Sequence, residues 1–108
     1  MNDRRACPRH TLKRPLACFL YASSGQTAGL AAAENVSLGG LGFRATTQPQ
    51  HGELLGVVLV DVPAPLRRQL LLRVVYANAD PSGGYFVGGQ FLQKLSTSQM
   101  QGLVGLVG

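Results

Sequence analysis

The stretch RQLLLRVVYANADPSGGYFVGGQFL, residues 68–92, decides the fold of this 108-residue chain. Its two halves are rich in β-branched, aliphatic and aromatic residues, which predicts strands over Arg68–Ala77 and Tyr85–Leu92. Between them lies DPSGG, residues 80–84, a cluster of turn-forming residues that indicates a hairpin. We therefore expect an antiparallel pair of strands here.

Upstream of this hairpin, four more apolar segments are separated by turn-forming residues. One of them contains Leu30-Ala-Ala-Ala33, a good helix former, but it is too short for a stable helix and its neighbours need a strand partner. We therefore predict strands in all four. Their ranges are Leu16–Ala22, Thr27–Glu34, Gly42–Thr46 and Leu54–Val62.

The C-terminal segment changes from strand to helix character. Ser96 and Gln99 have the spacing of a capping box, with Ser at the N-cap and Gln three residues later. One helical face follows, expected to pack on the core; it consists of Met100, Leu103, Val104 and Val107. The sequence thus predicts an all-β protein, a six-stranded antiparallel β-barrel over residues 15–108 that ends in an α-helix.

The positive charge is concentrated at the N-terminus. The net charge of the chain is +5, and residues 1–14 contain five basic residues against one acidic residue, a net charge of +4. Pro8 would interrupt a helix in this segment, and no hydrophobic periodicity is present. We therefore predict a basic N-terminal arm over residues 1–14, attached to a nearly neutral barrel. A local basic segment of this kind indicates a local anion site rather than a nucleic-acid-coating surface.

Several classes of protein are disfavoured by composition. No apolar run approaches the roughly 20 residues that span a bilayer, and the N-terminus lacks the apolar stretch of a signal peptide, so we expect a cytoplasmic protein without membrane insertion. In that compartment Cys7 and Cys18 are expected as free thiols. The two cysteines and two histidines have no metal-binding spacing, and no cofactor is predicted. Acidic residues are few and no nucleophile motif occurs, so we do not expect an enzyme.

Two motifs could bind a ligand. Arg5 and Arg9 form an R-x-x-x-R spacing, and in an extended arm their guanidinium groups could hold separate points of one phosphate-bearing ligand. Asn35, Ser37 and Gly40 form an N-x-S-x-x-G motif at a turn between strands. The two polar side chains could bind a base edge or could cap the turn through its backbone. Gly40 would permit a positive φ or the close approach of a ligand.

Together the two motifs, in this order, resemble the PilZ domain family, whose signature is RxxxR followed by [D/N]xSxxG. The resemblance covers most of the chain, and the family fold is similar to the barrel deduced above. It implies a bacterial second-messenger receptor that binds cyclic di-GMP. In that role Arg5 and Arg9 would hold phosphates and guanine edges, Asn35 and Ser37 would bind a guanine, and Gly40 would keep the surface clear.

The resemblance also implies a ligand stoichiometry and a partner. An arginine at the position of Arg4 accompanies binding of a stacked ligand pair in the family, although Arg4 could equally be a solvated arm residue. A receptor of this kind would transmit its signal to an effector protein that the sequence does not identify. The alternatives are a protein adaptor of the same fold that binds no ligand, and a small nucleic-acid-binding barrel. Nucleic acid is disfavoured because the barrel is nearly neutral and its aromatic residues form no paired stacking motif.

Overall fold

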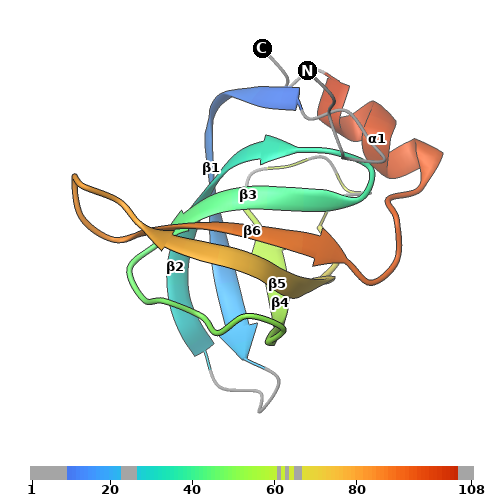
Figure 1. The fold of residues 1–108 in the computed structure, drawn as a ribbon. Coiled ribbons are helices and arrows are strands. Elements are labelled where there is room, and N and C mark those ends of the chain that lie inside the picture. The colour runs from blue at the N-terminus through green and yellow to red at the C-terminus, as the bar shows by residue number, and fades with distance from the viewer. Residues whose placement is uncertain (1–9, 23–26, 61, 63, 65–66, 105–108) are drawn as a thin grey trace, which may run out of the picture.

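The computed structural model describes residues 10–22, 27–60, 62, 64 and 67–104. Six strands form one closed antiparallel barrel in the order β1-β2-β3-β6-β5-β4, and the helix α1 lies at one end of it (Figure 1). The predicted all-β class, barrel and C-terminal helix are therefore confirmed. The elements are β1 (His10–Ala22), β2 (Thr27–Val36), β3 (Gly40–Ala45), β4 (Leu54–Leu59), β5 (Leu70–Ala79), β6 (Tyr85–Phe91) and α1 (Thr97–Val104).

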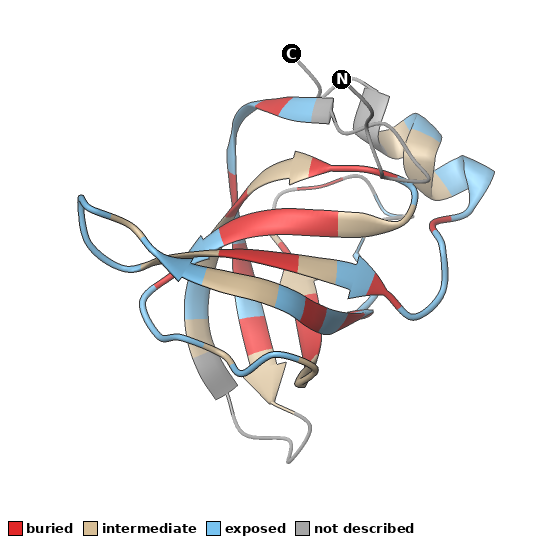
Figure 2. Ribbon diagram, viewed as in Figure 1, coloured by how far each residue is buried: buried red, intermediate tan, exposed pale blue. Residues whose placement is uncertain are grey.

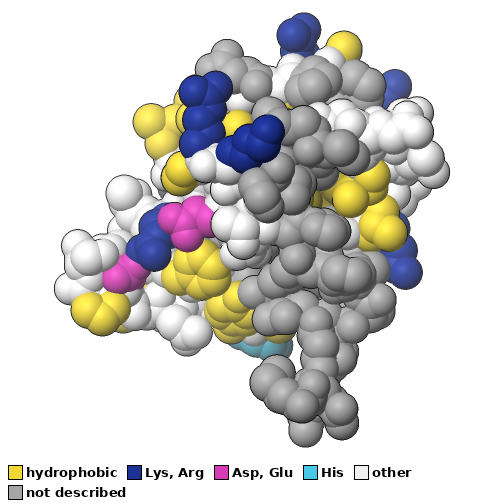
Figure 3. Space-filling model, turned by 90° about the horizontal axis from the view of Figure 1, so that it is seen from above, with side chains coloured by type: hydrophobic (Ala, Val, Ile, Leu, Met, Phe, Trp, Pro, Cys, Tyr) yellow, Lys and Arg dark blue, Asp and Glu magenta, His cyan; other side chains and the backbone are white. Residues whose placement is uncertain are grey.

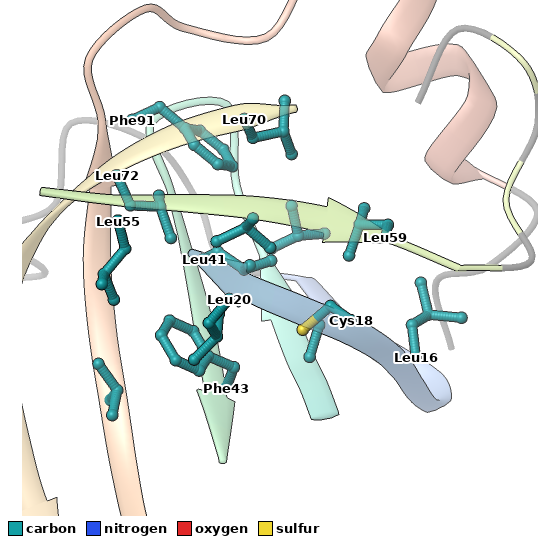
Figure 4. Close-up of a cluster of buried hydrophobic side chains, with 14 of the residues drawn as sticks. Leu16, Cys18, Leu20, Leu41, Phe43, Leu55, Leu59, Leu70, Leu72 and Phe91 are labelled. Carbon is teal, nitrogen blue, oxygen red and sulfur yellow. The ribbon is translucent and has the colours of Figure 1, made fainter. Parts of the chain in front are cut away.

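The core fills the inside of the barrel because successive side chains of each strand point to opposite faces. β5 shows this alternation most clearly: Leu70, Leu72 and Val74 are buried, while Leu71 and Arg73 are exposed. β3 and β4 each contain three consecutive buried residues instead, and Figure 2 shows this as a long buried stretch on β3. Figure 4 shows inward-pointing side chains of several strands meeting in one cluster.

Cys18 belongs to this cluster, and its free thiol is fully buried (Figure 4). Burial raises the pKa of the Cys18 thiol to about 11, against the smaller opposing effect of a backbone hydrogen bond at Ala33. The thiol is therefore protonated at neutral pH and behaves as a small apolar core side chain. Cys7 lies outside the described residues.

The first strand begins earlier than the sequence indicated. We predicted a strand from Leu16, but β1 begins at His10 and already pairs with β2 there, His10 opposite Val36 and Thr11 opposite Asn35. The register then shifts between Thr11 and Leu16, a stretch that contains Pro15. Proline cannot donate to the ladder and is tolerated at such irregularities. Residues 10–14, predicted as arm, are therefore part of the barrel.

The remaining boundaries differ from the predictions by a few residues. β3 begins at Gly40 rather than Gly42, so the last glycine of the N-x-S-x-x-G motif belongs to a strand. β4 ends at Leu59, before the predicted Val62, and β5 runs on to Ala79. A longer β5 extends the β5–β6 hairpin that projects from one side of the barrel (Figure 1).

The predicted hairpin turn and the predicted helix capping box are both present. In the hairpin, Asp80 N–H donates to the Gly84 carbonyl at 3.0 Å, and Gly83 and Gly84 have positive φ. At α1, Gln99 N–H donates to Ser96 Oγ at 3.1 Å, and Ser96 N–H donates to Gln99 Oε1 at 2.8 Å, which completes the capping box. Val107, the last residue of the predicted apolar helix face, lies outside the described residues. Within the described part of the chain, no helix is long and apolar enough to cross a bilayer.

Candidate functional site

Ser37 shapes the turn between β2 and β3. It is buried, and its Oγ accepts hydrogen bonds from Gly39 N–H at 3.2 Å and Gly40 N–H at 3.1 Å. Its own N–H donates to the Gly40 carbonyl at 2.9 Å. The hydroxyl therefore caps the turn, which was one of the two roles that the sequence left open. Because both acceptor positions are used, the hydroxyl hydrogen is what Ser37 can still offer to another group.

One of the two roles expected for Gly40, a positive φ, is wrong. Its φ is not in the positive range, so no left-handed conformation requires glycine here. A Cβ at this position would instead clash with the backbone carbonyl oxygen of Gly89 on β6. The missing side chain therefore lets two neighbouring strands approach closely, and the expected role of Gly40 in leaving room for a ligand stays a prediction.

The turn is also tied to the end of β6 and to the segment that follows it. Phe91 N–H donates to the Gly39 carbonyl at 2.7 Å, and Leu95 N–H donates to the Leu38 carbonyl at 3.1 Å. The buried side chains of Phe91 and Leu95 anchor that segment in the core. The turn is thus held from three sides, by Ser37, by β6 and by the segment leading to α1.

Asn35 lies in a row of four residues that crosses four strands. Asn35 is opposite Gly42, Gly42 is opposite Gly88, and Gly88 is opposite Tyr76. The row faces outward, because the chain neighbours of Gly42 are buried. A Cβ on Gly42 would clash with the Asn35 amide, and a Cβ on Gly88 would clash with the Tyr76 ring. The two glycines therefore let an amide and an aromatic ring lie flat on the barrel, one at each end of the row.

Arg44 forms a polar cluster beside this row. Its Nε lies 2.7 Å from Glu34 Oε2, its Nη1 pairs with Asp80, and its guanidinium lies 5.8 Å from the centroid of the Phe86 ring. Phe86 in turn lies 6.3 Å from the Tyr76 ring, centroid to centroid. Figure 3 shows a dark blue basic side chain between two magenta acidic ones on this flank. Arg44 is therefore neutralised and packed on an aromatic ring.

The predicted site residues of the arm, Arg4, Arg5 and Arg9, lie outside the described residues. Among the described residues, Thr11 on β1 lies opposite Asn35, the first residue of the N-x-S-x-x-G motif.

Sequence reasoning missed Tyr76 and the roles of Gly42 and Gly88. Gly42 lies inside one predicted strand, and Gly88 and Gly89 lie inside another. A glycine inside a strand is a recognised sign of close approach by another group. That sign was available, but the approaching groups come from neighbouring strands, and only the register identifies them.

The comparisons with known proteins agree with this fold. The family model of the PilZ domain matches residues 3–108, and the chain belongs to the PilZ domain family. The resemblance drawn from the two motifs is thereby confirmed. No sequence among the curated proteins is significantly similar to the chain.

Three solved structures share the fold at low sequence identity. The PilZ domain with c-di-GMP of YcgR from Escherichia coli is 16% identical, with a TM-score of 0.67, and the match covers 92% of this chain and 85% of that one. The inhibitor of motility MotI/DgrA from Bacillus subtilis is 18% identical, with a TM-score of 0.68 and coverages of 97% and 50%. The MrkH–c-di-GMP complex of K. pneumonia is 18% identical, with a TM-score of 0.68 and coverages of 94% and 50%. The chain thus spans about half the length of the last two proteins.

Proposed function

We propose that this chain is a non-catalytic receptor for cyclic di-GMP, with Arg5, Arg9, Asn35, Ser37 and Gly40 at its binding site. The observation that supports the proposal is the pairing of Asn35 with Thr11, which follows Arg9 by two residues in the sequence. Two of the structural neighbours, the YcgR PilZ domain and MrkH, have this nucleotide in their structures. A receptor for a second messenger acts inside the bacterial cell, in line with the predicted cytoplasmic location.

Each residue type suits one part of the ligand. The planar guanidinium groups of Arg5 and Arg9 can bind phosphate oxygens in pairs and can also reach guanine edges. The Asn35 amide, lying flat over Gly42, offers a donor and an acceptor to a base edge. Ser37 contributes the turn geometry and its remaining hydroxyl hydrogen.

Tyr76 adds an aromatic surface to the same row. Its ring lies over Gly88, one strand beyond Gly42, so a guanine held at its edge by Asn35 would have an aromatic ring nearby. Base–aromatic stacking is worth about 1–3 kcal/mol per base. We include Tyr76 in the proposed site on this ground.

A binding role without catalysis also fits the polar groups of this face. The two carboxylates near the row, Glu34 and Asp80, are both engaged by Arg44 and are poorly placed to carry protons to or from a ligand. Signal transmission would therefore depend on contact with an effector protein.

Titration calorimetry with cyclic di-GMP tests the site. Arg5→Ala and Arg9→Ala should each weaken binding at least about tenfold, because a hydrogen bond to a charged group contributes about 1.5–3 kcal/mol. Arg68→Ala, which removes an exposed arginine outside the site, is the matched control and should bind like the wild type. Wild-type affinity in both arm variants would exclude this site. Tighter binding of a short oligonucleotide would favour the nucleic-acid alternative, and no binding of either would favour the adaptor.

The same titration tests the role of Arg4. A stacked pair of ligands brings four negative charges into one site, and three arginines in the arm would offset their repulsion. We expect two ligands per chain in the wild type and a shift toward one in Arg4→Leu. A wild-type stoichiometry of one would reduce Arg4 to a solvated arm residue.

A further inference from the structure

Two leucines on the outside of the barrel are exposed side by side, away from the proposed nucleotide site. Leu71 on β5 is 52% exposed and Leu92, just after β6, is 49% exposed. Leu92 N–H donates to the Leu71 carbonyl at 3.0 Å, which holds the two residues next to each other. Leu71 points outward because its neighbours Leu70 and Leu72 point into the core. Adjacent exposed leucines of this kind are typical of interaction surfaces.

The surface around them is hollowed. One depression of about 810 Å³ runs from the residues before β5 to the start of α1, and a second of about 410 Å³ continues toward β4 and the end of β1. Gln69, Leu71 and Leu92 line both depressions, so the two form one continuous groove, which we call the leucine groove. A Cβ on Gly56 would clash with Gln69, so the floor of the groove is closely packed there.

The leucine groove has basic residues at its rim. Arg68 and Lys94 line the larger depression and are exposed, and Arg73 lies two residues beyond Leu71 on the same outward face of β5. Among the described residues, no aspartate or glutamate lines either depression. The groove therefore combines an aliphatic centre with a positively charged edge.

We propose that the leucine groove binds a segment of a partner protein that carries apolar side chains flanked by carboxylates. The apolar side chains would cover Leu71 and Leu92, and the carboxylates would pair with Arg68 and Lys94. Charge complementarity at the rim would set the orientation and the choice of partner. This proposal does not depend on the nucleotide, because none of the groove residues belongs to the proposed nucleotide site.

Other occupants fit less well. A second copy of the chain would have to supply acidic groups, but of those that the structure describes, Glu34 and Asp80 bind Arg44 and Glu53 accepts a hydrogen bond from Gln50 N–H. The N-terminal arm is itself basic and would be repelled by the rim. Single-stranded nucleic acid stacks its bases on aromatic side chains, whereas the centre of this groove is aliphatic.

The direct test uses synthetic peptides and fluorescence anisotropy, with no nucleotide present. A short labelled peptide of alternating leucine and glutamate should bind at least about tenfold more tightly than its leucine–lysine or serine–glutamate counterpart, and added salt should weaken the binding. Lack of measurable binding of the leucine–glutamate peptide up to about 1 mM protein would overturn the proposal. Equal binding of the leucine–lysine peptide would overturn it as well.

Two variants locate the binding. Leu71→Ser/Leu92→Ser should abolish it, while Leu30→Ser, which changes a 62% exposed leucine outside the groove, should leave it intact. Arg68→Glu/Lys94→Glu should reverse the preference, so that the leucine–lysine peptide binds more tightly than the leucine–glutamate peptide. Lys13→Glu, an exposed residue that does not line the groove, is the matched charge control. Unchanged binding in both groove variants would mean that the peptide binds elsewhere and would overturn the proposal. A wild-type protein that is a dimer, and that Leu71→Ser converts to a monomer, would overturn it as well.

Discussion

The glycine row around Gly42 and the leucine groove around Leu71 both lie on the outside of the barrel, yet they are built in opposite ways. In the row, side chains are missing where neighbouring groups press against the backbone. In the groove, large apolar side chains project into solvent. A substitution should therefore be costly at a glycine whose Cβ would meet backbone, less costly where the Cβ would meet the end of a side chain, and cheap in the groove, where each side chain has solvent around it. Four substitutions test this contrast.

The largest effect on stability is expected at Gly40. Gly40→Ala places a Cβ against the Gly89 carbonyl, a backbone group that cannot rotate away, so β3 and β6 must separate locally. Overpacking of this kind costs up to about 3 kcal/mol, and we expect a loss near that value in urea unfolding. A loss below about 1 kcal/mol would show that the strands move apart easily and would weaken the contrast with the groove.

Gly42→Ala should separate stability from binding. The new Cβ meets the end of the Asn35 side chain, which can swing away, so the loss of stability should stay below about 1 kcal/mol. The displaced amide should lower the affinity for cyclic di-GMP about fivefold, since a neutral hydrogen bond to a base edge contributes about 1 kcal/mol. Calorimetry on the double variant Gly42→Ala/Asn35→Ala provides the control. It should bind no more weakly than Asn35→Ala alone, and additive losses would contradict this explanation.

A smaller loss is expected at Ser96, where the leucine groove meets α1. Ser96→Ala removes the oxygen that accepts from Gln99 N–H, and loss of an N-cap costs about 1 kcal/mol. We expect a thermal midpoint lowered by a few degrees, measured by circular dichroism. Ser98→Ala, an exposed serine in the first turn of the same helix, is the matched control and should have no measurable effect.

The smallest effect on stability is expected at Leu71. Leu71→Ser changes an exposed side chain and should alter the free energy of unfolding by no more than about 0.5 kcal/mol. A loss above about 2 kcal/mol would mean that Leu71 supports the fold rather than a surface. In that case peptide binding would be tested with the charge-reversed variant Arg68→Glu/Lys94→Glu, which leaves Leu71 in place.

The elements that sequence reasoning identified best are those defined by residues close together in the chain. The hairpin at residues 80–84 and the capping box of Ser96 and Gln99 depend on a few consecutive residues, and both formed as predicted. The predicted start of β1 was wrong because the residues that pair with it, Asn35 and Val36, lie far away in sequence. The charged residues and Pro15 between His10 and Leu16 are untypical of a strand, so the strand was not predicted there.

The candidate site shows the same division. The motif residues were visible in the sequence, and the turn-capping role of Ser37 was one of the two readings available from it. The clash that excludes a side chain at Gly40 could not be predicted from the sequence, because the clashing carbonyl belongs to Gly89 on another strand. Tyr76 was missed since only the register of β5, β6 and β3 brings it into the row with Asn35.

Two backbone hydrogen bonds link the Ser37–Gly40 turn to the end of β6 and to the segment after it. These bonds have a thermodynamic consequence. Leu38 and Gly39 accept hydrogen bonds from Leu95 and Phe91, and the residues between those two donors line the leucine groove. A ligand that displaces the turn must move this segment with it or break the bonds. If the nucleotide and the acidic segment both bind as proposed, reciprocity requires each to change the affinity of the other by the same factor. The barrel would then act as a coupled receptor, with these backbone hydrogen bonds as one link between its two surfaces.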